Sequence, residues 1–214
     1  MNQKLLLSIT MTLDVISIEP KQGQKPEFVF VLLHGWGSNY HDLTALTSML
    51  NLPSCLYLFP NAPYPHYQVP DGRAWYALEN DNEGIEASLN QLYQWLLSLE
   101  DRTEIPLSKT IIGGFSQGGA MSLDVGLQLP VAGVVSLSGY LHFKPTPDRN
   151  PFPPTFISHG RLDAVVPINT AQEAKNKLEA VGVKVEYKEF DITHEIIPAQ
   201  IHLVRDFVLK SINL

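Results

Sequence analysis

The sequence predicts an α/β fold with a mostly parallel central sheet and helices on both faces. Short apolar runs alternate with amphipathic runs along the chain, which is the order expected of repeated strand and helix units. One early run, Phe28–Leu33, is continuously apolar, as is typical of a central strand covered on both sides. The length of 214 residues, with 44% apolar and 17% charged residues, favours a single folded domain over residues 1–214.

The first half of the chain supplies three expected strands and two expected helices. The strands are 13–18, which alternates with period two, then 28–33 and 56–59. The helices are 42–50 and 83–99, and the second carries an apolar stripe made of Ile85, Leu89, Leu92, Leu96 and Leu99. Between them, the proline-rich and aromatic segment 60–80 fits neither period. It is long for a connection, and long loops in compact domains are often functional.

The second half continues the alternation with four more strands and three more helices. Strands are expected at 110–114, 131–137, 155–158 and 184–190, the last of which alternates as an edge strand would. Helices are expected at 117–129, 168–181 and 195–210. Pro130 and Gly182 end the first two of these helices. The proline-rich stretch 143–154 is interpreted as a loop.

Composition and charge exclude several kinds of protein. The formal charge of -7 opposes binding to phosphate backbones, so no nucleic-acid partner is expected. The single cysteine, Cys55, cannot form an internal disulfide and lies in an apolar run, which indicates a buried thiol. The apolar run near Met1 is too short for a membrane span and lacks a cleavage site, so a cytoplasmic protein without a transmembrane segment is expected.

The strongest chemical signal is Gly114-Phe115-Ser116-Gln117-Gly118. An apolar strand runs directly into this Gly-x-Ser-x-Gly motif and a helix follows, which is the context of the nucleophile turn in the α/β-hydrolase fold. The tight turn lifts the serine hydroxyl above the sheet edge at a helix N-terminus, where negative charge is favoured. We therefore expect Ser116 to be a catalytic nucleophile.

A serine nucleophile needs a base and a carboxylate, which follow it in that fold in the order acid, then histidine. His194 lies between a strand and the last helix, whereas His202 lies within that helix and is expected to face solvent. Asp163 follows the strand 155–158 by a short turn, and we expect it to be the acid. Asp191 is the rival, but it is close in sequence to the histidine, and Asp148 lies in the proline-rich loop.

Acyl transfer also needs donors aimed at the oxygen that becomes negative. One should be the backbone N–H of Gln117, directly after the nucleophile, and the second should come from the loop after the early central strand. That loop is His34-Gly35-Trp36-Gly37, in which we expect the Trp36 N–H to point inward and its side chain to wall the pocket. His34 itself is interpreted as a structural histidine that bonds its own loop.

Four segments together resemble the phospholipase/carboxylesterase family, the small lidless α/β-hydrolases that include acyl-protein thioesterases. They are Leu33-His34-Gly35-Trp36-Gly37, Gly114-Phe115-Ser116-Gln117-Gly118-Gly119, the stretch His159-Gly160-Arg161-Leu162-Asp163-Ala164-Val165-Val166-Pro167, and His194-Glu195-Ile196.

The resemblance implies a Ser116, Asp163 and His194 triad, oxyanion donors at Trp36 and Gln117, and hydrolysis of carboxylic esters or thioesters without a cofactor. The sequence departs from the family pattern at Trp36, where leucine is common, at Ser38 and Ala77, where aspartate is common, and at Thr193, where glycine is usual. These departures bear on the pocket and the choice of substrate rather than on the reaction.

The partner expected from this reading is a small or lipid-like acyl ester, held by Trp36, Trp75 and Tyr76. Two other functions stay open: a peptidase or other acyl hydrolase on the same triad, and a catalytically silent binding protein with this fold. A metal site is not expected, because the sequence has no ligand spacing such as His-Glu-x-x-His. A homodimer is possible, and neither the acyl length nor the natural substrate follows from the sequence.

Overall fold

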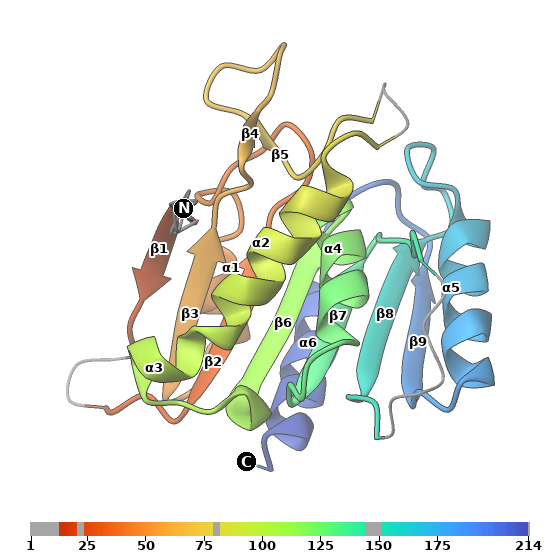
Figure 1. Ribbon diagram of the computed structural model, residues 1–214. Helices are drawn as coiled ribbons and strands as arrows, with labels where there is room; N and C mark the ends of the chain where they lie inside the picture. The colour runs from red at the N-terminus through yellow and green to blue at the C-terminus, as the bar shows by residue number, and fades with distance from the viewer. Residues whose placement is uncertain (1–12, 21–23, 79–81, 144–150, 214) are drawn as a thin grey trace, which may run out of the picture.

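A computed structural model describes residues 13–20, 24–78, 82–143 and 151–213. Seven strands form one sheet in the order β1-β3-β2-β6-β7-β8-β9 (Figure 1). Only β1 runs antiparallel to its neighbour β3, and every other pair is parallel. The strands are β1 (Val15–Ile18), β2 (Phe28–Leu33), β3 (Cys55–Pro60), β6 (Thr110–Phe115), β7 (Gly133–Leu137), β8 (Thr155–Gly160) and β9 (Val185–Phe190). The expected mostly parallel sheet is therefore confirmed.

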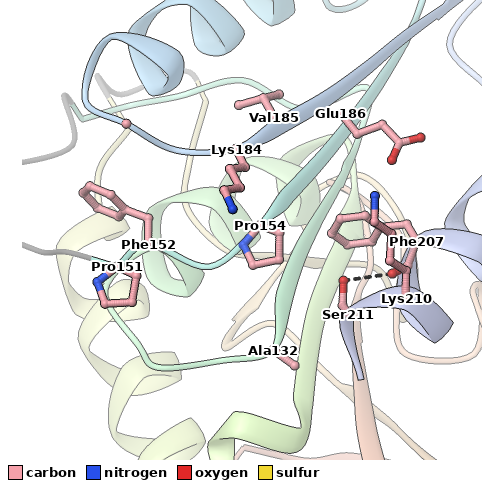
Figure 2. A pocket seen from close by; sticks show the side chains of 11 residues that line it. Ala132, Pro151, Phe152, Pro154, Lys184, Val185, Glu186, Phe207, Lys210 and Ser211 are labelled. Atoms are coloured by element: carbon pink, nitrogen blue, oxygen red, sulfur yellow. Dashed lines mark hydrogen bonds between the residues drawn. The ribbon is translucent and has the colours of Figure 1, made fainter. Parts of the chain in front are cut away.

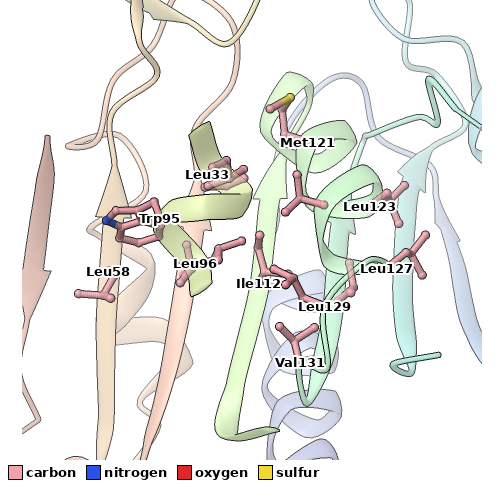
Figure 3. Packing of buried hydrophobic residues seen from close by; sticks show 14 of the residues in the cluster. Leu33, Leu58, Trp95, Leu96, Ile112, Met121, Leu123, Leu127, Leu129 and Val131 are labelled. Atoms are coloured by element: carbon pink, nitrogen blue, oxygen red, sulfur yellow. The ribbon is translucent and has the colours of Figure 1, made fainter. Parts of the chain in front are cut away.

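Alternate side chains of β2 explain why this strand is apolar throughout. Val29, Val31 and Leu33 belong to one buried cluster, and the intervening phenylalanines and Leu32 belong to another on the opposite face. Figure 3 shows part of the first cluster, with Trp95 and Met121 among the side chains gathered over the sheet. Both faces of the sheet are thus hydrophobic and both need a layer of helices.

The helices supply these layers. Helices α2 (Ile85–Leu97), α4 (Gln117–Gly126) and α5 (Ile168–Ala180) contribute to the first cluster, while α1 (Leu46–Leu50) and α6 (Pro198–Ser211) contribute to the second. Figure 1 shows α2, α4 and α5 in front of the sheet, with α1 and α6 behind it. The expectation of helices on both faces is confirmed.

Several element boundaries differ from those expected. The helix expected at 83–99 is α2, which ends at Leu97, and a separate short helix α3 (Leu99–Thr103) follows it. The Ser98 hydroxyl donates to the Trp95 carbonyl at the junction. The last helix begins at Pro198 rather than at 195, since proline suits the first helical position. The helix expected at 117–129 ends at Gly126, and the one expected at 42–50 begins only at Leu46.

The segment expected to be irregular contains a small second sheet. Strands β4 (Tyr64–Pro65) and β5 (Arg73–Ala74) pair antiparallel, and a 3₁₀ helix (Leu107–Lys109) precedes β6. Cys55 is fully buried, as expected. Within the described ranges, no helix combines the length and the apolar character needed to cross a membrane.

Parallel strands deliver their loops to one edge of the sheet. Strands β2, β6, β8 and β9 all end at this edge, and the loops that follow them carry Trp36, Ser116, Asp163 and His194 respectively. Ligand sites of open α/β sheets lie beyond the carboxyl ends of their strands. This edge is therefore the place to examine for a functional site.

Candidate active site

Ser116 occupies a strained turn between β6 and α4. Its backbone has φ 55° and ψ -120°, a left-handed φ that is rare for a residue with a side chain. The Ser116 N–H donates to the Leu137 carbonyl at 2.8 Å, which ties the turn to the end of the neighbouring strand β7. Observed strain of this kind clusters at functional sites.

Glycine is required at Gly118, directly after this turn. A methyl group placed on Gly118 would lie 2.1 Å from the Leu33 carbonyl oxygen and 2.5 Å from that of His34. A methyl group on Gly35 would be in van der Waals contact with the Ser116 Cβ, at 3.4 Å. The loop after β2 and the first turn of α4 are therefore in close backbone contact, beside the serine.

Asp163 and His194 meet at the same edge. The His194 Nδ1 lies 2.7 Å from the Asp163 Oδ2, and the other carboxylate oxygen accepts the N–H groups of Val165 at 2.9 Å and Val166 at 2.8 Å. Burial by itself raises the pKa of Asp163, but these hydrogen bonds outweigh it, so the pKa lies below its usual value. The carboxylate is thus held ionised and oriented toward the Nδ1 edge of the imidazole.

His194 also lies close to the turn that carries Ser116. Its ring centroid is 4.7 Å from that of Phe115, the residue before Ser116, and its side chain is 18% exposed. His202 is exposed on α6, as expected. Asp191 is 79% exposed and bonds Arg161 rather than His194, and Asp148 lies outside the described residues.

The two amides expected to bind an oxyanion donate to no backbone acceptor among the described residues. Gly37 donates to the Arg73 carbonyl and Ser38 to that of Gly35, whereas the Trp36 N–H has no acceptor within the described parts of the chain. Gln117 is the first residue of α4, and amides of a first helical turn have no intrahelical acceptor. Both amides therefore have donor capacity to offer to a ligand.

His34 holds the loop that carries Trp36. Its Nδ1 donates to the Gly35 carbonyl at 2.8 Å, and its Nε2 accepts the Ala62 N–H at 3.1 Å, so both ring nitrogens are occupied by backbone. Burial lowers the pKa of His34 from 6.5 to about 4, which keeps the ring neutral. The interpretation as a structural histidine that bonds its own loop is confirmed.

The Gln117 side chain has a role that the sequence analysis missed. It accepts the Trp75 N–H and donates to the Tyr76 carbonyl, both at 2.9 Å, although these residues are more than forty positions away. The Trp75 indole N–H donates in turn to the His34 carbonyl at 3.0 Å. The glutamine inside the serine motif was the available sequence signal, but the spacing of the motif does not indicate its partners.

His159 is a second residue whose role was missed. It is fully buried behind Asp163, with its Nε2 donating to the Val166 carbonyl at 2.8 Å and lying 3.4 Å from the Asp163 carboxylate. This contact fixes the turn that presents Asp163 to His194.

A pocket of about 480 Å³ opens beside the loop after β2. It is lined by Trp36, Tyr64, Pro65, His66, Tyr67, Ala74, Ala77, Glu83 and Gly84. The Trp36 ring meets the edge of the His66 ring at a centroid distance of 4.2 Å. Trp75 and Tyr76, also expected to bind substrate, are fully buried beneath this region, and their role as substrate contacts stays a prediction.

A second hollow of about 670 Å³ lies at the opposite edge of the sheet, near the amino ends of β7, β8 and β9 (Figure 2). Pro154, Lys184 and Phe207 are among its lining residues, and no expected site residue is among them. Across the described chain, no three His, Cys, Asp or Glu side chains are grouped to hold a metal ion.

Known proteins resemble this chain in sequence and in fold. The model of the phospholipase/carboxylesterase family matches residues 14–212. Acyl-protein thioesterase 1 of Mycosarcoma maydis is 30% identical, over 94% of this chain and 98% of its own length. The crystal structure of esterase PE8 superposes with a TM-score of 0.82 at 29% identity, covering 93% of this chain and 99% of its own. Acyl-protein thioesterase 2 of Zea mays shares the fold, with a TM-score of 0.75 at 24% identity over 94% of this chain and all of its own.

Proposed function

The chain belongs to the phospholipase/carboxylesterase family, and from this premise we propose that Ser116, Asp163 and His194 carry out its hydrolysis of esters or thioesters. The observation that supports the proposal most is the 2.7 Å contact between Asp163 and His194 at the sheet edge where Ser116 occupies its strained turn. Because the buried, ionised Asp163 carboxylate accepts a hydrogen bond from the His194 Nδ1–H, Nε2 is the basic nitrogen of the imidazole.

The reaction proceeds in two halves. The Ser116 Oγ attacks the acyl carbonyl carbon while His194 Nε2 takes its proton, and the resulting oxyanion accepts hydrogen bonds from the Trp36 and Gln117 amides. The protonated His194 then gives the proton to the departing alcohol or thiol, which leaves Ser116 acylated. Water activated by His194 attacks this acyl-enzyme, and the acid is released with Ser116 regenerated.

The acyl side of the substrate is proposed to enter the pocket beside Trp36. Its aromatic rings and its position next to the loop that carries the Trp36 amide support this assignment. Trp75 and Tyr76 would form the floor beneath this pocket, in the segment whose backbone the Gln117 side chain holds. The relatives that are named acyl-protein thioesterases make an acyl thioester a natural first substrate to test alongside oxygen esters.

Substitution of the serine provides the test. Ser116→Ala should lose about 10³-fold or more in kcat on a short-chain chromogenic ester while keeping its folding transition. Ser211→Ala is the matched control, because its hydroxyl only donates to the Phe207 carbonyl on α6. A fluorophosphonate should label Ser116 in the unmodified protein. Near wild-type turnover by Ser116→Ala, or a label mapped to another residue by mass spectrometry, would refute the assignment.

A matched series of esters and thioesters of increasing acyl length addresses the substrate. If the pocket beside Trp36 holds the acyl chain, kcat/KM should rise with chain length until the pocket is filled. The same rise should be reduced in Trp36→Ala, and an unchanged profile in that variant would show that the acyl chain lies elsewhere.

A further inference from the structure

A second buried histidine–aspartate pair lies outside the three residues proposed for catalysis. The His142 Nδ1 makes a short contact with the Asp124 Oδ2, and the two side chains are only 7% and 1% exposed. The other nitrogen of His142 lies 2.7 Å from the Tyr76 hydroxyl, which lies 2.6 Å from the Tyr140 hydroxyl. Four polar side chains thus form one continuous hydrogen-bonded chain inside the protein.

The two phenols set the directions of the hydrogen bonds in this chain. Burial raises the pKa of both Tyr76 and Tyr140, so each remains a neutral phenol. With a neutral imidazole, Tyr140 donates to Tyr76, Tyr76 donates to His142, and the His142 Nδ1–H donates to the Asp124 carboxylate. Each hydrogen in the chain has one acceptor, which defines the position of every ring.

This chain reaches the nucleophile turn through Tyr76. The Tyr76 hydroxyl is held by His142, while its carbonyl accepts a hydrogen bond from the Gln117 side chain at 2.9 Å. Gln117 and Asp124 are seven residues apart on α4, so they lie on the same side of the helix two turns apart. Gln117, Tyr76, His142 and Asp124 therefore form a hydrogen-bonded bracket that begins and ends on α4. The first amide of this helix, that of Gln117, is the proposed oxyanion donor.

Stability alone does not account for the Asp124–His142 pair. One oxygen of Asp124 is buried with no hydrogen-bond partner among the described residues. The other residues of α4 are buried as well. A buried carboxylate of this kind costs free energy, and apolar residues of similar size often stabilise such positions better. A costly buried pair is expected to persist where it fixes a geometry that an apolar contact would leave loose.

We propose that Asp124 and His142 are positioning residues of the hydrolase reaction, which act through Tyr76 to fix Gln117 and its backbone amide. The inference rests on the proposed function, because that amide matters only if it binds the oxyanion. Misplacement of a catalytic donor by about 1 Å costs on the order of 100-fold in rate. The oxyanion forms in the transition state and is absent from the bound substrate. Loss of a hydrogen bond in the bracket should therefore lower kcat and leave KM nearly unchanged.

Three variants test this proposal. Tyr76→Phe removes only the hydroxyl that joins the bracket, and Asp124→Leu removes the carboxylate, so each should lower kcat by about 10-fold or more with KM within about 3-fold. Asp124→Asn keeps an oxygen for the His142 Nδ1–H and should recover most of the activity. Tyr57→Phe is the control, because Tyr57 is also a buried tyrosine, and its hydroxyl contacts the Leu52 N–H and the Cys55 thiol rather than any group proposed for catalysis.

The readouts are kcat and KM on a chromogenic ester, the rate of Ser116 labelling by a fluorophosphonate, and the thermal transition. Tyr76→Phe and Tyr57→Phe should lose similar stability, but only Tyr76→Phe should show slower turnover and slower labelling. If Tyr76→Phe folds and labels at the wild-type rate, the positioning role is overturned; this variant decides the matter if Asp124→Leu does not fold. Labelling of the wild type at a residue other than Ser116 would instead overturn the proposed function.

Discussion

Mild acid should destabilise this protein through one buried side chain, His34. Its imidazole is 1% exposed, and both nitrogens are used by the backbone of Gly35 and Ala62. A proton added to Nε2 would face the Ala62 N–H, a donor, so the bond between the loop after β2 and the segment after β3 would be lost. Burial is the main reason that the pKa of His34 falls from 6.5 to about 4.

The sign and the size of the effect follow from this difference. Between pH 6.5 and about 4 the unfolded chain binds a proton at His34 and the folded protein does not. The stabilisation is therefore complete above pH 6.5 and is lost as the pH falls toward 4. A pKa difference of about 2.5 corresponds to about 3 kcal/mol, a substantial part of the stability of a typical domain.

Urea unfolding at several pH values between about 7.5 and 4.5 measures this loss directly. The free energy of unfolding should fall by about 2 to 3 kcal/mol over this range, and the fall should be much smaller in His34→Gln, which has nothing to protonate. His202→Gln is the matched control, since His202 is exposed and its variant should keep the wild-type slope. A wild-type stability that changes by less than about 1 kcal/mol, or an unchanged slope in His34→Gln, would refute the reasoning.

Three other substitutions test the acid of the proposed triad and the packing beside the serine turn. Asp163→Asn should lose about 10³-fold or more in kcat with little change in the thermal transition, because the imidazole loses its ionised partner. Asp191→Asn should keep wild-type kcat, since Asp191 contacts only Arg161 at the surface, and an inactive Asp191→Asn would show that the acid is misassigned. Gly118→Ala should lose about 3 kcal/mol or more of stability in urea unfolding, because its methyl group would lie 2.1 Å from the Leu33 carbonyl oxygen. A Gly118→Ala protein as stable as the wild type would mean that the loop after β2 can move away from α4.

Local sequence signals were sufficient to predict the central strands of the sheet and the turn that carries Ser116. The run Phe28–Leu33 is apolar at every position because each face of β2 meets a helix layer. The Gly-x-Ser-x-Gly motif lies between a strand and a helix, and the left-handed φ of Ser116 is the turn that this context predicts. In both cases the physical cause lies within a few residues of the pattern.

Features that depend on distant partners were not predictable. The Gln117 side chain joins Trp75 and Tyr76, and the Asp124–His142 pair joins α4 to the loop after β7, through contacts that no periodicity encodes. Propensity and pattern describe the average residue of an element, whereas these features each depend on one pair of atoms.

The parallel sheet separates catalysis from substrate selection, and evolution can change one without the other. Ser116, Asp163 and His194 each follow the end of a strand, and Tyr64 and Tyr67 of the pocket belong to a different segment, which contains β4 and β5. That segment is attached to the rest by defined hydrogen bonds, among them those from the Gln117 side chain to the backbone of Trp75 and Tyr76 and those between Arg73 and the loop after β2. Exchange of the segment between related chains that keep these attachment points would alter what is hydrolysed without altering how.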